Sequence, residues 1–328
     1  MPARAPVSRR AIIGGLLASA VAGSAPKQLV VSKKGGPFRT VQEAIDAVPR
    51  GNVTPYTIVI RPGTYLERWT VPRDKPFIRL IGEDANRTTL TYNLSTATTA
   101  ETRYSASGYV FADDFQAEGI TFENSYGTGS QAVALFVGAD RARFRACRFL
   151  GWQDTLYVNG PGCHFVPQPL ATVDAADCPA GRHTFDDCYI EGHVDFIFGN
   201  AAARFRRCHI HSKGPGYVTA QSKTYAGQTS GFVFDACRLT GENTGPGVYL
   251  GRPWRAYAQV VFLKCWLGPH IRPEGWSVWN ENRNHETAFY AEFESEGPGA
   301  SPHSRVAWSH QLSPAEAARF LSPIYAEQ

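Results

Sequence analysis

Short apolar-polar alternations recur along the chain and share a common context. In five of them, Phe stands three residues before a cysteine and Phe, Ile or Leu stands two residues after it. These cysteines are Cys147, Cys188, Cys208, Cys237 and Cys265. A period of two indicates a strand with one buried face. Gly, Asn, Asp and Pro bound the runs, and no long helical pattern separates them, so the pattern predicts many short strands.

The spacing of these cysteines indicates how the strands are arranged. Successive cysteines are 41, 20, 29 and 28 residues apart, and an earlier copy around Ile120 lacks the cysteine. Strands that repeat every 20 to 30 residues without intervening helices fit a parallel β-helix, in which each coil stacks on the one before. The 41-residue step is then one coil with an insertion. A sandwich or barrel is the alternative, but neither explains the constant context of the cysteines, which we interpret as small buried residues in an inward ladder.

Two short helices are predicted at the ends of the solenoid. Val41, Ala44, Ile45 and Val48 have helical spacing, and Pro49 then ends the helix. We expect this helix to cover the exposed strand edges at the start of the solenoid. A second helix is expected to begin with Ser313 as N-cap and Pro314 in its first turn, and to run through Phe320.

Composition and charge narrow the functional classes. The chain has 328 residues, of which 43% are apolar and 19% charged, which is typical of a globular protein. The net charge of +4 is too small to indicate nucleic-acid binding, although it is compatible with an anionic substrate.

The N-terminus has the pattern of an export signal. Arg9 and Arg10 precede an apolar stretch of small residues, and possible cleavage sites follow near residues 20–25. Paired arginines favour the twin-arginine route, and the stretch is shorter than the ~20 residues of a membrane anchor. We therefore expect residues 1–25 to be a cleaved signal, and residues 26–328 to be one secreted or periplasmic domain without a membrane segment.

The register of the repeat brings two carboxylates together. Asp154 lies seven residues after Cys147, and Asp195 lies seven residues after Cys188. If these cysteines stack, the aspartates stack too, about 5 Å apart on neighbouring coils. Like charges so close separate their pKa values, which suits acid-base or nucleophilic chemistry. The alternative is a purely structural ladder of turn aspartates, and register alone does not decide between the two.

The residues around the aspartates favour a catalytic pair over a purely structural ladder. Gln131 and Gln153 are about one coil apart and could donate amide hydrogens to an oxyanion, although glutamine ladders also occur for structural reasons. Arg252 can hold a carboxylate bidentately, and Trp254 offers a flat surface to a sugar ring.

Together these fragments resemble the pectinesterases, a family of right-handed parallel β-helix enzymes that use no metal or organic cofactor. The resemblance covers the chain from about residue 28 onward and rests on motifs in the family's order. These motifs are GTYLE at 63–67, QAVAL at 131–135, QDTLY at 153–157, DFIFG at 195–199 and LGRPW at 250–254.

The resemblance implies a role for each matching residue. Asp195 would be the nucleophile, Asp154 the general acid and then base, and Arg252 the group that orients Asp195. Gln131 and Gln153 would stabilise the oxyanion. The residues that would line the sugar subsites are Tyr157, Val194, Phe198 and Trp254. The implied substrate is methyl-esterified polygalacturonate, and we expect a monomer that binds no nucleic acid.

One stretch departs from the family. Asp154 and Asp195 are farther apart than is usual, and the extra residues, roughly 160–181, contain Cys163 and Cys178. These two cysteines lie outside the repeat in a chain expected to be exported, so we expect a disulfide between them. The insertion bears on substrate preference more than on the chemistry, because both flanking motifs are intact.

Parts of the pattern also fit other functions. Two close carboxylates also suit a pectin depolymerase, either a polygalacturonase or a lyase. A secreted carbohydrate-binding solenoid would need the aromatic residues alone. His209 and His211 share a strand face, but no third ligand stands at metal spacing, so no metal site is expected. No G-x-S-x-G occurs, which disfavours a serine hydrolase.

Overall fold

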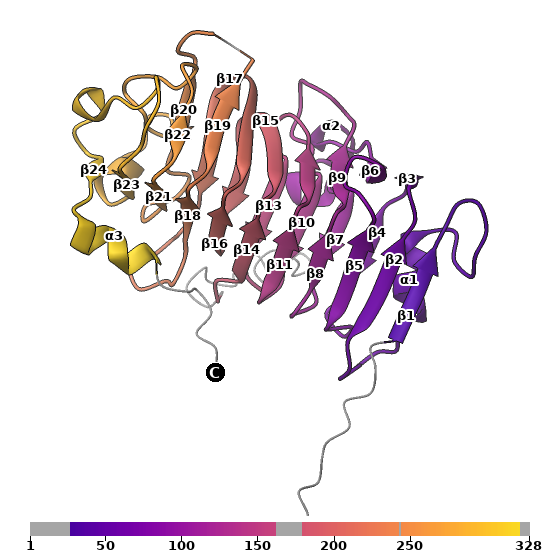
Figure 1. Cartoon of the computed structure of the whole chain (residues 1–328). Helices are drawn as coiled ribbons and strands as arrows, with labels where there is room; N and C mark the ends of the chain where they lie inside the picture. Colours follow the sequence, from indigo (N-terminus) through magenta and orange to yellow (C-terminus); the bar gives the residue numbers. More distant parts are fainter. Residues whose placement is uncertain (1–26, 162–178, 243, 322–328) are drawn as a thin grey trace, which may run out of the picture.

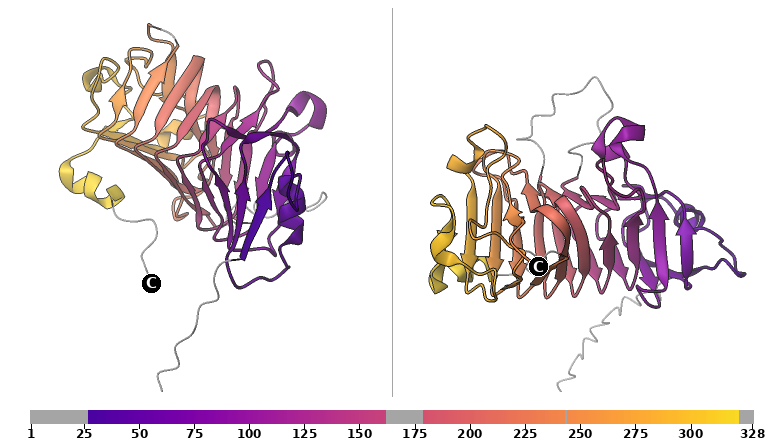
Figure 2. Two further views of the ribbon diagram at one scale, coloured as in Figure 1. Left: turned by 45° about the vertical axis from the view of Figure 1, so that its right-hand side comes forward. Right: turned by 90° about the horizontal axis from the view of Figure 1, so that it is seen from above.

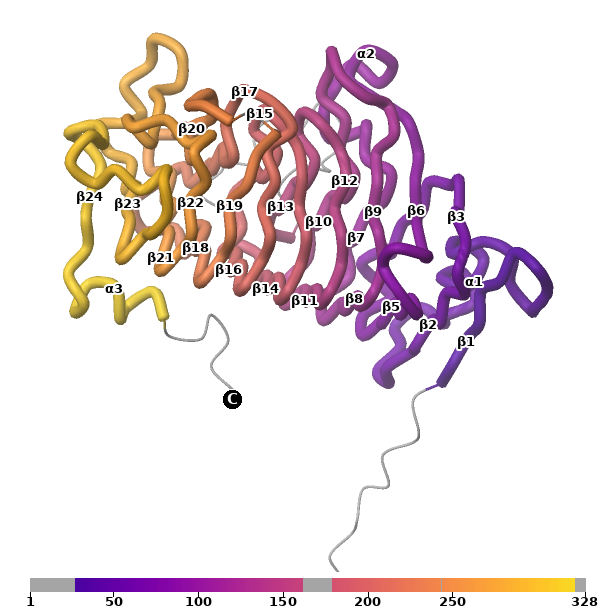
Figure 3. The backbone as a smooth tube through the Cα atoms, turned by 45° about the horizontal axis from the view of Figure 1, so that its top comes forward, coloured from indigo at the N-terminus to yellow at the C-terminus, as the bar shows by residue number. Residues whose placement is uncertain are grey.

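The chain winds into a right-handed parallel β-helix, as expected from the repeat (Figure 1). The structure is a computed structural model and describes residues 27–161, 179–242 and 244–321. The coils follow one another along a single axis from the N-terminal to the C-terminal end (Figures 2 and 3). The predicted signal at residues 1–25 and the predicted Cys163–Cys178 disulfide lie outside the described residues.

The described strands form three faces. Within each face, hydrogen-bonded neighbouring strands run parallel to each other. One face is an eleven-stranded sheet: β1 (Lys27–Val31), β2 (Tyr56–Ile60), β5 (Ile78–Gly82), β8 (Gln116–Glu118), β11 (Ala142–Arg145), β14 (Arg182–Asp186), β16 (Ala202–Arg206), β18 (Gly231–Asp235), β21 (Gln259–Leu263), β23 (Phe289–Phe293) and β24 (His310–Gln311). The second face holds β3 (Gly63–Leu66), β6 (Thr88–Tyr92), β9 (Thr121–Asn124), β12 (Arg148–Leu150), β19 (Arg238–Gly241) and β22 (Trp266–Leu267). The third face holds β4 (Trp69–Val71), β7 (Gly108–Val110), β10 (Leu135–Gly138), β13 (Leu156–Asn159) and β20 (Val248–Gly251).

Two long strands run from the second face into the third. β15 (Tyr189–Gly199) pairs with β12 through its first residues and with β13 through its last. β17 (His209–Gln221) continues both faces in the next coil. The pairing of β15 with β17 shifts register between Gly192 and Ile197, so the backbone is irregular where the two faces meet.

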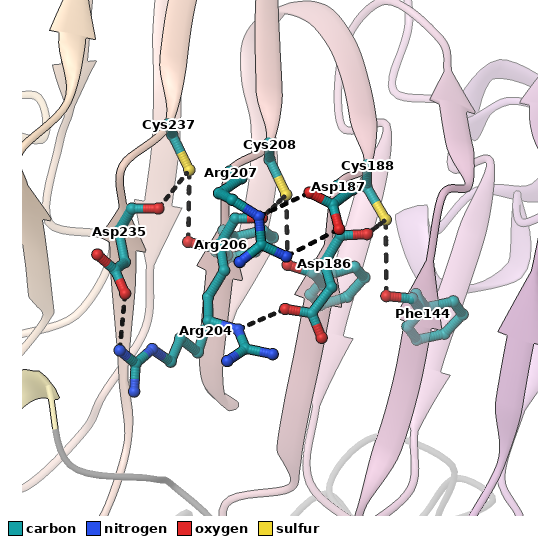
Figure 4. Close-up of polar contacts among 12 residues, drawn as sticks. Phe144, Asp186, Asp187, Cys188, Arg204, Arg206, Arg207, Cys208, Asp235 and Cys237 are labelled. Carbon is teal, nitrogen blue, oxygen red and sulfur yellow. Dashed lines mark hydrogen bonds and ion pairs between the residues drawn. The ribbon is translucent and has the colours of Figure 1, made fainter.

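The cysteine ladder confirms the predicted register. Arg148 pairs with Tyr189, so Cys147 and Cys188 occupy equivalent places in neighbouring coils despite the 41 residues between them. The later cysteines follow in the same register, and all five are buried. From the second cysteine onward, each thiol donates to the carbonyl oxygen of the Phe in the preceding coil, as Cys208 does to Phe185 at 3.3 Å (Figure 4).

The phenylalanines before the cysteines form a second ladder inside the solenoid. They are Phe144, Phe185, Phe205, Phe234 and Phe262. Neighbouring rings are stacked with centroids 4.4–4.8 Å apart and interplanar angles of 4–12°. Such pairs contribute about 0.5–1.5 kcal/mol each beyond the burial of their area. One coil can slide past the next only by breaking this stack.

A repeated backbone bend and outward ion pairs accompany the two ladders. The residue directly before each cysteine has a positive φ of 50–54°, as at Ala146 and Arg207, which turns the chain from one face to the next. Outside the bend, Arg207 pairs with Asp187 at 2.8 Å, and Arg204 pairs with Asp235 at 2.7 Å (Figure 4). Each pair joins neighbouring coils. The Arg207–Asp187 pair is exposed and contributes little to stability, whereas the Arg204–Asp235 pair is largely buried.

The N-terminal helix is confirmed as a cap. α1 (Val41–Ala47) packs on β1, β2 and β4 and buries Val41, Ala44 and Ile45 in the common core. Glu67, from the GTYLE motif, accepts hydrogen bonds from the backbone N–H groups of Val41 and Gln42, so it satisfies free donors at the helix N-terminus.

The C-terminal helix is also confirmed. α3 (Pro314–Leu321) begins directly after Ser313, whose hydroxyl and backbone N–H bond to Glu316. The other helical segments in the described ranges are short: α2 (Thr96–Thr99), η1 (Thr102–Tyr104), η3 (Asn284–Glu286) and η4 (Pro302–Ser304).

The five ladder cysteines are expected to resist alkylation in the folded protein. Their side chains are buried, and burial raises the pKa of the thiols of Cys147, Cys208 and Cys265, whereas the thiolate is the reactive form. Iodoacetamide labelling followed by peptide mass spectrometry should find these five cysteines modified only after denaturation. Labelling of Cys188 in native protein at the rate of an unfolded control would contradict the ladder.

Candidate active site

Asp154 and Asp195 occupy equivalent positions on neighbouring coils, as the register predicted. Leu156 pairs with Ile197, and the N–H of Asp154 donates to the carbonyl oxygen of Val194 at 3.1 Å. Both aspartates have a positive φ, 64° for Asp154 and 50° for Asp195. Few residue types other than Gly adopt this conformation readily, and Asp is one of them. The two bends present both carboxyl groups to one cavity.

Arg252 holds Asp195 in a bidentate ion pair. Its Nε lies 3.0 Å from Oδ1 and its Nη2 lies 2.6 Å from Oδ2. Both side chains are largely buried, with exposed fractions of 16% for Arg252 and 8% for Asp195. The planar guanidinium therefore holds the carboxylate in one orientation and favours its ionised form.

Two aromatic rings hold Arg252 itself. Its guanidinium carbon lies 3.9 Å from the ring centroid of Tyr217 and 4.1 Å from that of Trp279. Tyr217 in turn stacks on Tyr249 in the next coil. Sequence reasoning missed Tyr217 and Trp279. Neither residue lies in one of the five motifs, and nothing in the sequence indicates that the two rings face Arg252.

The two carboxyl groups have different electrostatic environments. Burial raises the pKa of both. For Asp195, the hydrogen bonds and charge of Arg252 act against this rise. For Asp154, the negative charge of Asp195 adds to the rise, and Arg252 acts only through its charge at longer range, so its pKa lies well above the usual value. In the pair, Asp154 therefore retains a proton while Asp195 is ionised.

Gln131 and Gln153 line the cavity beside the aspartates. The hydroxyl of Thr96, at the start of α2, donates to Oε1 of Gln131 at 2.6 Å. Because the amide oxygen is engaged in this way, the NH₂ group of Gln131 is the part left to donate into the cavity. Thr96 was not singled out from the sequence, since it lies far from the motifs.

The cavity has a volume of about 550 Å³ and an aromatic floor. Tyr157 and Phe198 are stacked with ring centroids 4.1 Å apart, and the ring centroid of Trp254 lies 6.1 Å from that of Phe198. Tyr157 lies in β13, Phe198 lies in β15, and Trp254 lies in the connection after β20. Together the three rings form an apolar surface next to the carboxyl groups. Such a surface suits the flat apolar side of a sugar ring.

Comparison with known proteins identifies the family. The family model described as Pectinesterase matches residues 28–174 and 170–326. Pectinesterase 31 of Arabidopsis thaliana is 40% identical over 304 residues, which cover 89% of each chain. The chain belongs to the pectinesterase family. It is therefore a carboxylic ester hydrolase.

Solved pectin methylesterases share the fold of this pectinesterase. The carrot enzyme superposes with a TM-score of 0.80 at 33% identity, covering 90% of this chain and 91% of that one. A pectin methylesterase in complex with a hexasaccharide superposes with a TM-score of 0.74 at 28% identity, covering 90% of this chain and 96% of that one.

Eight of the nine site residues predicted for this pectinesterase line the one cavity. Val194 does not line it; it is half-buried beside Asp195, so its part in sugar binding stays a prediction. The two family matches meet at residues 170–174, within the expected insertion. Over the ranges that the structure describes, no group of three His, Cys, Asp or Glu residues could hold a metal ion. His209 and His211 instead both contact the hydroxyl of Thr240.

Replacing Tyr217 by Leu is expected to lower kcat by about 3- to 30-fold, because cation–π contacts of this kind contribute about 0.5–2 kcal/mol. Tyr217→Phe keeps the ring and should retain most activity. Both variants should leave KM nearly unchanged, since the ring acts on Arg252 and not on the sugar. Equal losses in the two variants would show that the hydroxyl, not the ring face, matters.

Proposed function

We propose that the enzyme hydrolyses the methyl esters of galacturonan in pectin and releases methanol, with Asp195 as nucleophile. The observation that carries the proposal is the unequal pair of stacked carboxyl groups. Arg252 holds Asp195 in a bidentate ion pair, whereas Asp154 is buried and, among the described residues, has no hydrogen-bonded counter-charge. An ionised nucleophile thus lies beside a protonated acid, as ester cleavage through an acyl-enzyme requires.

The first half of the reaction forms the acyl-enzyme. A carboxylate oxygen of Asp195 attacks the ester carbonyl carbon, and negative charge develops on the carbonyl oxygen. The amide groups of Gln131 and Gln153 donate hydrogen bonds to this oxyanion. The bond to the methoxy group then breaks, the departing oxygen takes the proton of Asp154, and methanol leaves.

The second half regenerates both aspartates. Asp154, now ionised, accepts a proton from water while the water oxygen attacks the carbonyl carbon of the anhydride. The bond to Asp195 breaks, and its electron pair returns to the Asp195 carboxylate, where Arg252 stabilises it. The product leaves as a galacturonic acid that releases its proton to solvent and becomes a carboxylate, and Asp154 is protonated again.

The substrate assignment draws on the cavity floor and on a relative. A pectin methylesterase has been solved in complex with a hexasaccharide. In this chain Tyr157, Phe198 and Trp254 would carry the sugar rings, and Val194 would lie close to the reacting unit. The relatives and solved structures named above are esterases, so they give no support to a depolymerase or to a non-catalytic binding protein.

Export and domain organisation are part of the proposal. Residues 1–25 would direct export by the twin-arginine route, and residues 26–328 would act as a monomeric, cofactor-free domain outside the cytoplasm. Across the described ranges, no helix has the length and apolar character needed to cross a membrane.

Asp195→Asn is the direct test of the nucleophile. Asn keeps the shape of Asp and tolerates the positive φ of this position, whereas it cannot attack the ester. Methanol release from methylated pectin should fall by about 10³-fold or more, with an unchanged circular dichroism spectrum. Reducing ends and unsaturated products should be assayed in parallel with wild-type enzyme, since their appearance would favour a depolymerase. A variant that keeps a substantial part of the activity would refute the assignment.

The pH profile of kcat/KM should be bell-shaped. Activity needs Asp195 ionised and Asp154 protonated, so it is lost below the lower and above the higher apparent pKa of the pair. The bidentate contact of Arg252 lowers the pKa of Asp195, so Arg252→Lys, which cannot reproduce it, should move the acid limb to higher pH. Arg283→Lys, at an exposed site that does not line the cavity, is the control. An acid limb that stays in place in Arg252→Lys would argue against Asp195 as the group that must be ionised.

A further inference from the structure

β17 contains a bulge opposite the segment that leads into Asp195. β15 has one residue, His193, between two of its paired positions, whereas β17 has four residues there, 213–216. At Gly216 the two backbones come so close that a Cβ atom would lie 2.0 Å from the carbonyl oxygen of His193. Bulges are common next to active sites, where they change the direction in which a side chain points. Here the bulge begins at Lys213.

Lys213 is a largely buried cation with three contacts in the two preceding coils. Its Nζ donates to Oε1 of Glu191 at 3.0 Å and to the carbonyl oxygen of Gly151 at 3.2 Å. The same Nζ lies 4.0 Å from the ring centroid of Trp152. The exposed fraction is 16% for the side chains of both Lys213 and Glu191, so solvent and salt screen their contact only weakly.

The contacts of Lys213 lie shortly before the two catalytic aspartates. Trp152 is two residues before Asp154. Glu191 is four residues before Asp195. Through one side chain, β17 therefore joins the segments that lead into both aspartates.

Other contacts link the same two segments. The N–H of His193 donates to the carbonyl oxygen of Trp152 at 3.0 Å, and the two rings meet edge-on with centroids 5.6 Å apart. The hydroxyl of Thr155 donates to the carbonyl oxygen of Glu191 at 2.8 Å. These bonds join two neighbouring coils, and Lys213 connects both of them to a third.

The aspartates need such support because the regular pairing is interrupted where they lie. The register between β15 and β17 shifts between Gly192 and Ile197, and both aspartates have a positive φ. Backbone in this conformation is strained and persists only where its surroundings hold it. A cation that binds an acceptor on each of two coils fixes the position of one coil relative to the other. That relative position sets the separation of the nucleophile from the acid.

We infer that Lys213 is a positioning residue, which holds the two coils in the alignment that brings Asp154 and Asp195 to one ester group. This inference rests on the proposed function. Lys213 does not line the cavity, so it acts on the aspartates through the backbone and not on the sugar chain.

Lys213→Met removes the charge and the hydrogen-bond donors but keeps an unbranched side chain over Trp152. The kcat of methanol release from methylated pectin should fall about 10- to 100-fold with KM nearly unchanged, because a misplacement of about 1 Å can cost up to about 100-fold. The pH limits of kcat/KM should stay in place, since burial and the charges of Asp195 and Arg252 set the pKa of Asp154. A shifted alkaline limb would show that Lys213 acts through its charge, which would overturn the inference.

Arg204→Met is the matched control for a general loss of stability. Arg204 also pairs with a carboxylate of a neighbouring coil, that of Asp235, and is similarly buried. It lies in β16 of the eleven-stranded sheet and does not line the cavity. This variant should lower the melting temperature and leave kcat unchanged. An equal fall of kcat in Arg204→Met would mean that loosening any coil slows the reaction, and a special role for Lys213 would be lost.

Glu191→Gln keeps the inference testable if Lys213→Met does not fold. The amide oxygen still accepts from Lys213 but carries no charge, so the contact is weaker and kcat should fall about 2- to 5-fold, again with unchanged pH limits. An unchanged kcat in this variant, or in folded Lys213→Met, would overturn the inference. Absence of methanol release by wild-type enzyme from any pectin would instead contradict the proposed function.

Discussion

The in-register stacking of neighbouring coils is the constraint on which the rest of this structure depends. Strands ~4.8 Å apart bring residues that are far apart in sequence into contact, provided that no coil slips. The phenylalanine stack and the thiol–carbonyl bonds of the cysteines resist such a slip, because a shift by one residue would break the stack and turn the inward side chains outward. The fixed register then places Asp195 beside Asp154.

Stacking alone would make two equivalent aspartates, and the chemistry needs two different ones. The difference comes from a third coil, which supplies Arg252 to Asp195 and not to Asp154. Tyr217 and Trp279 keep the guanidinium between their faces, so the orientation of the nucleophile depends on aromatic packing as well as on charge. Both aspartates also adopt a positive φ where the second and third faces meet, and backbone strain of this kind is common at functional sites.

The cavity combines the rigid solenoid with less regular connections. Tyr157 and Phe198 of the aromatic floor come from β13 and β15, whose spacing the solenoid sets, and Trp254 comes from the connection after β20. The ends and rim come from connections, among them the α2 and η1 segment that carries Thr96, Glu101 and Arg103. A change in such a connection can alter the lining of the cavity and leave the stacked core intact.

The sequence by itself determined the solenoid, its N-terminal capping helix, its C-terminal helix, the stacking of Asp154 on Asp195 and, through its motifs, the family. These follow from period-two patterns, capping residues and constant spacing, which are local properties of the sequence. Because the pattern repeats, equivalent residues of successive coils lie above one another. Only the tertiary structure decided how the side chains meet across coils. The packing of Arg252 between Tyr217 and Trp279 and the bond of Thr96 to Gln131 depend on connections of irregular length. No periodicity constrains such connections, so their side chains are placed only once the whole solenoid has formed.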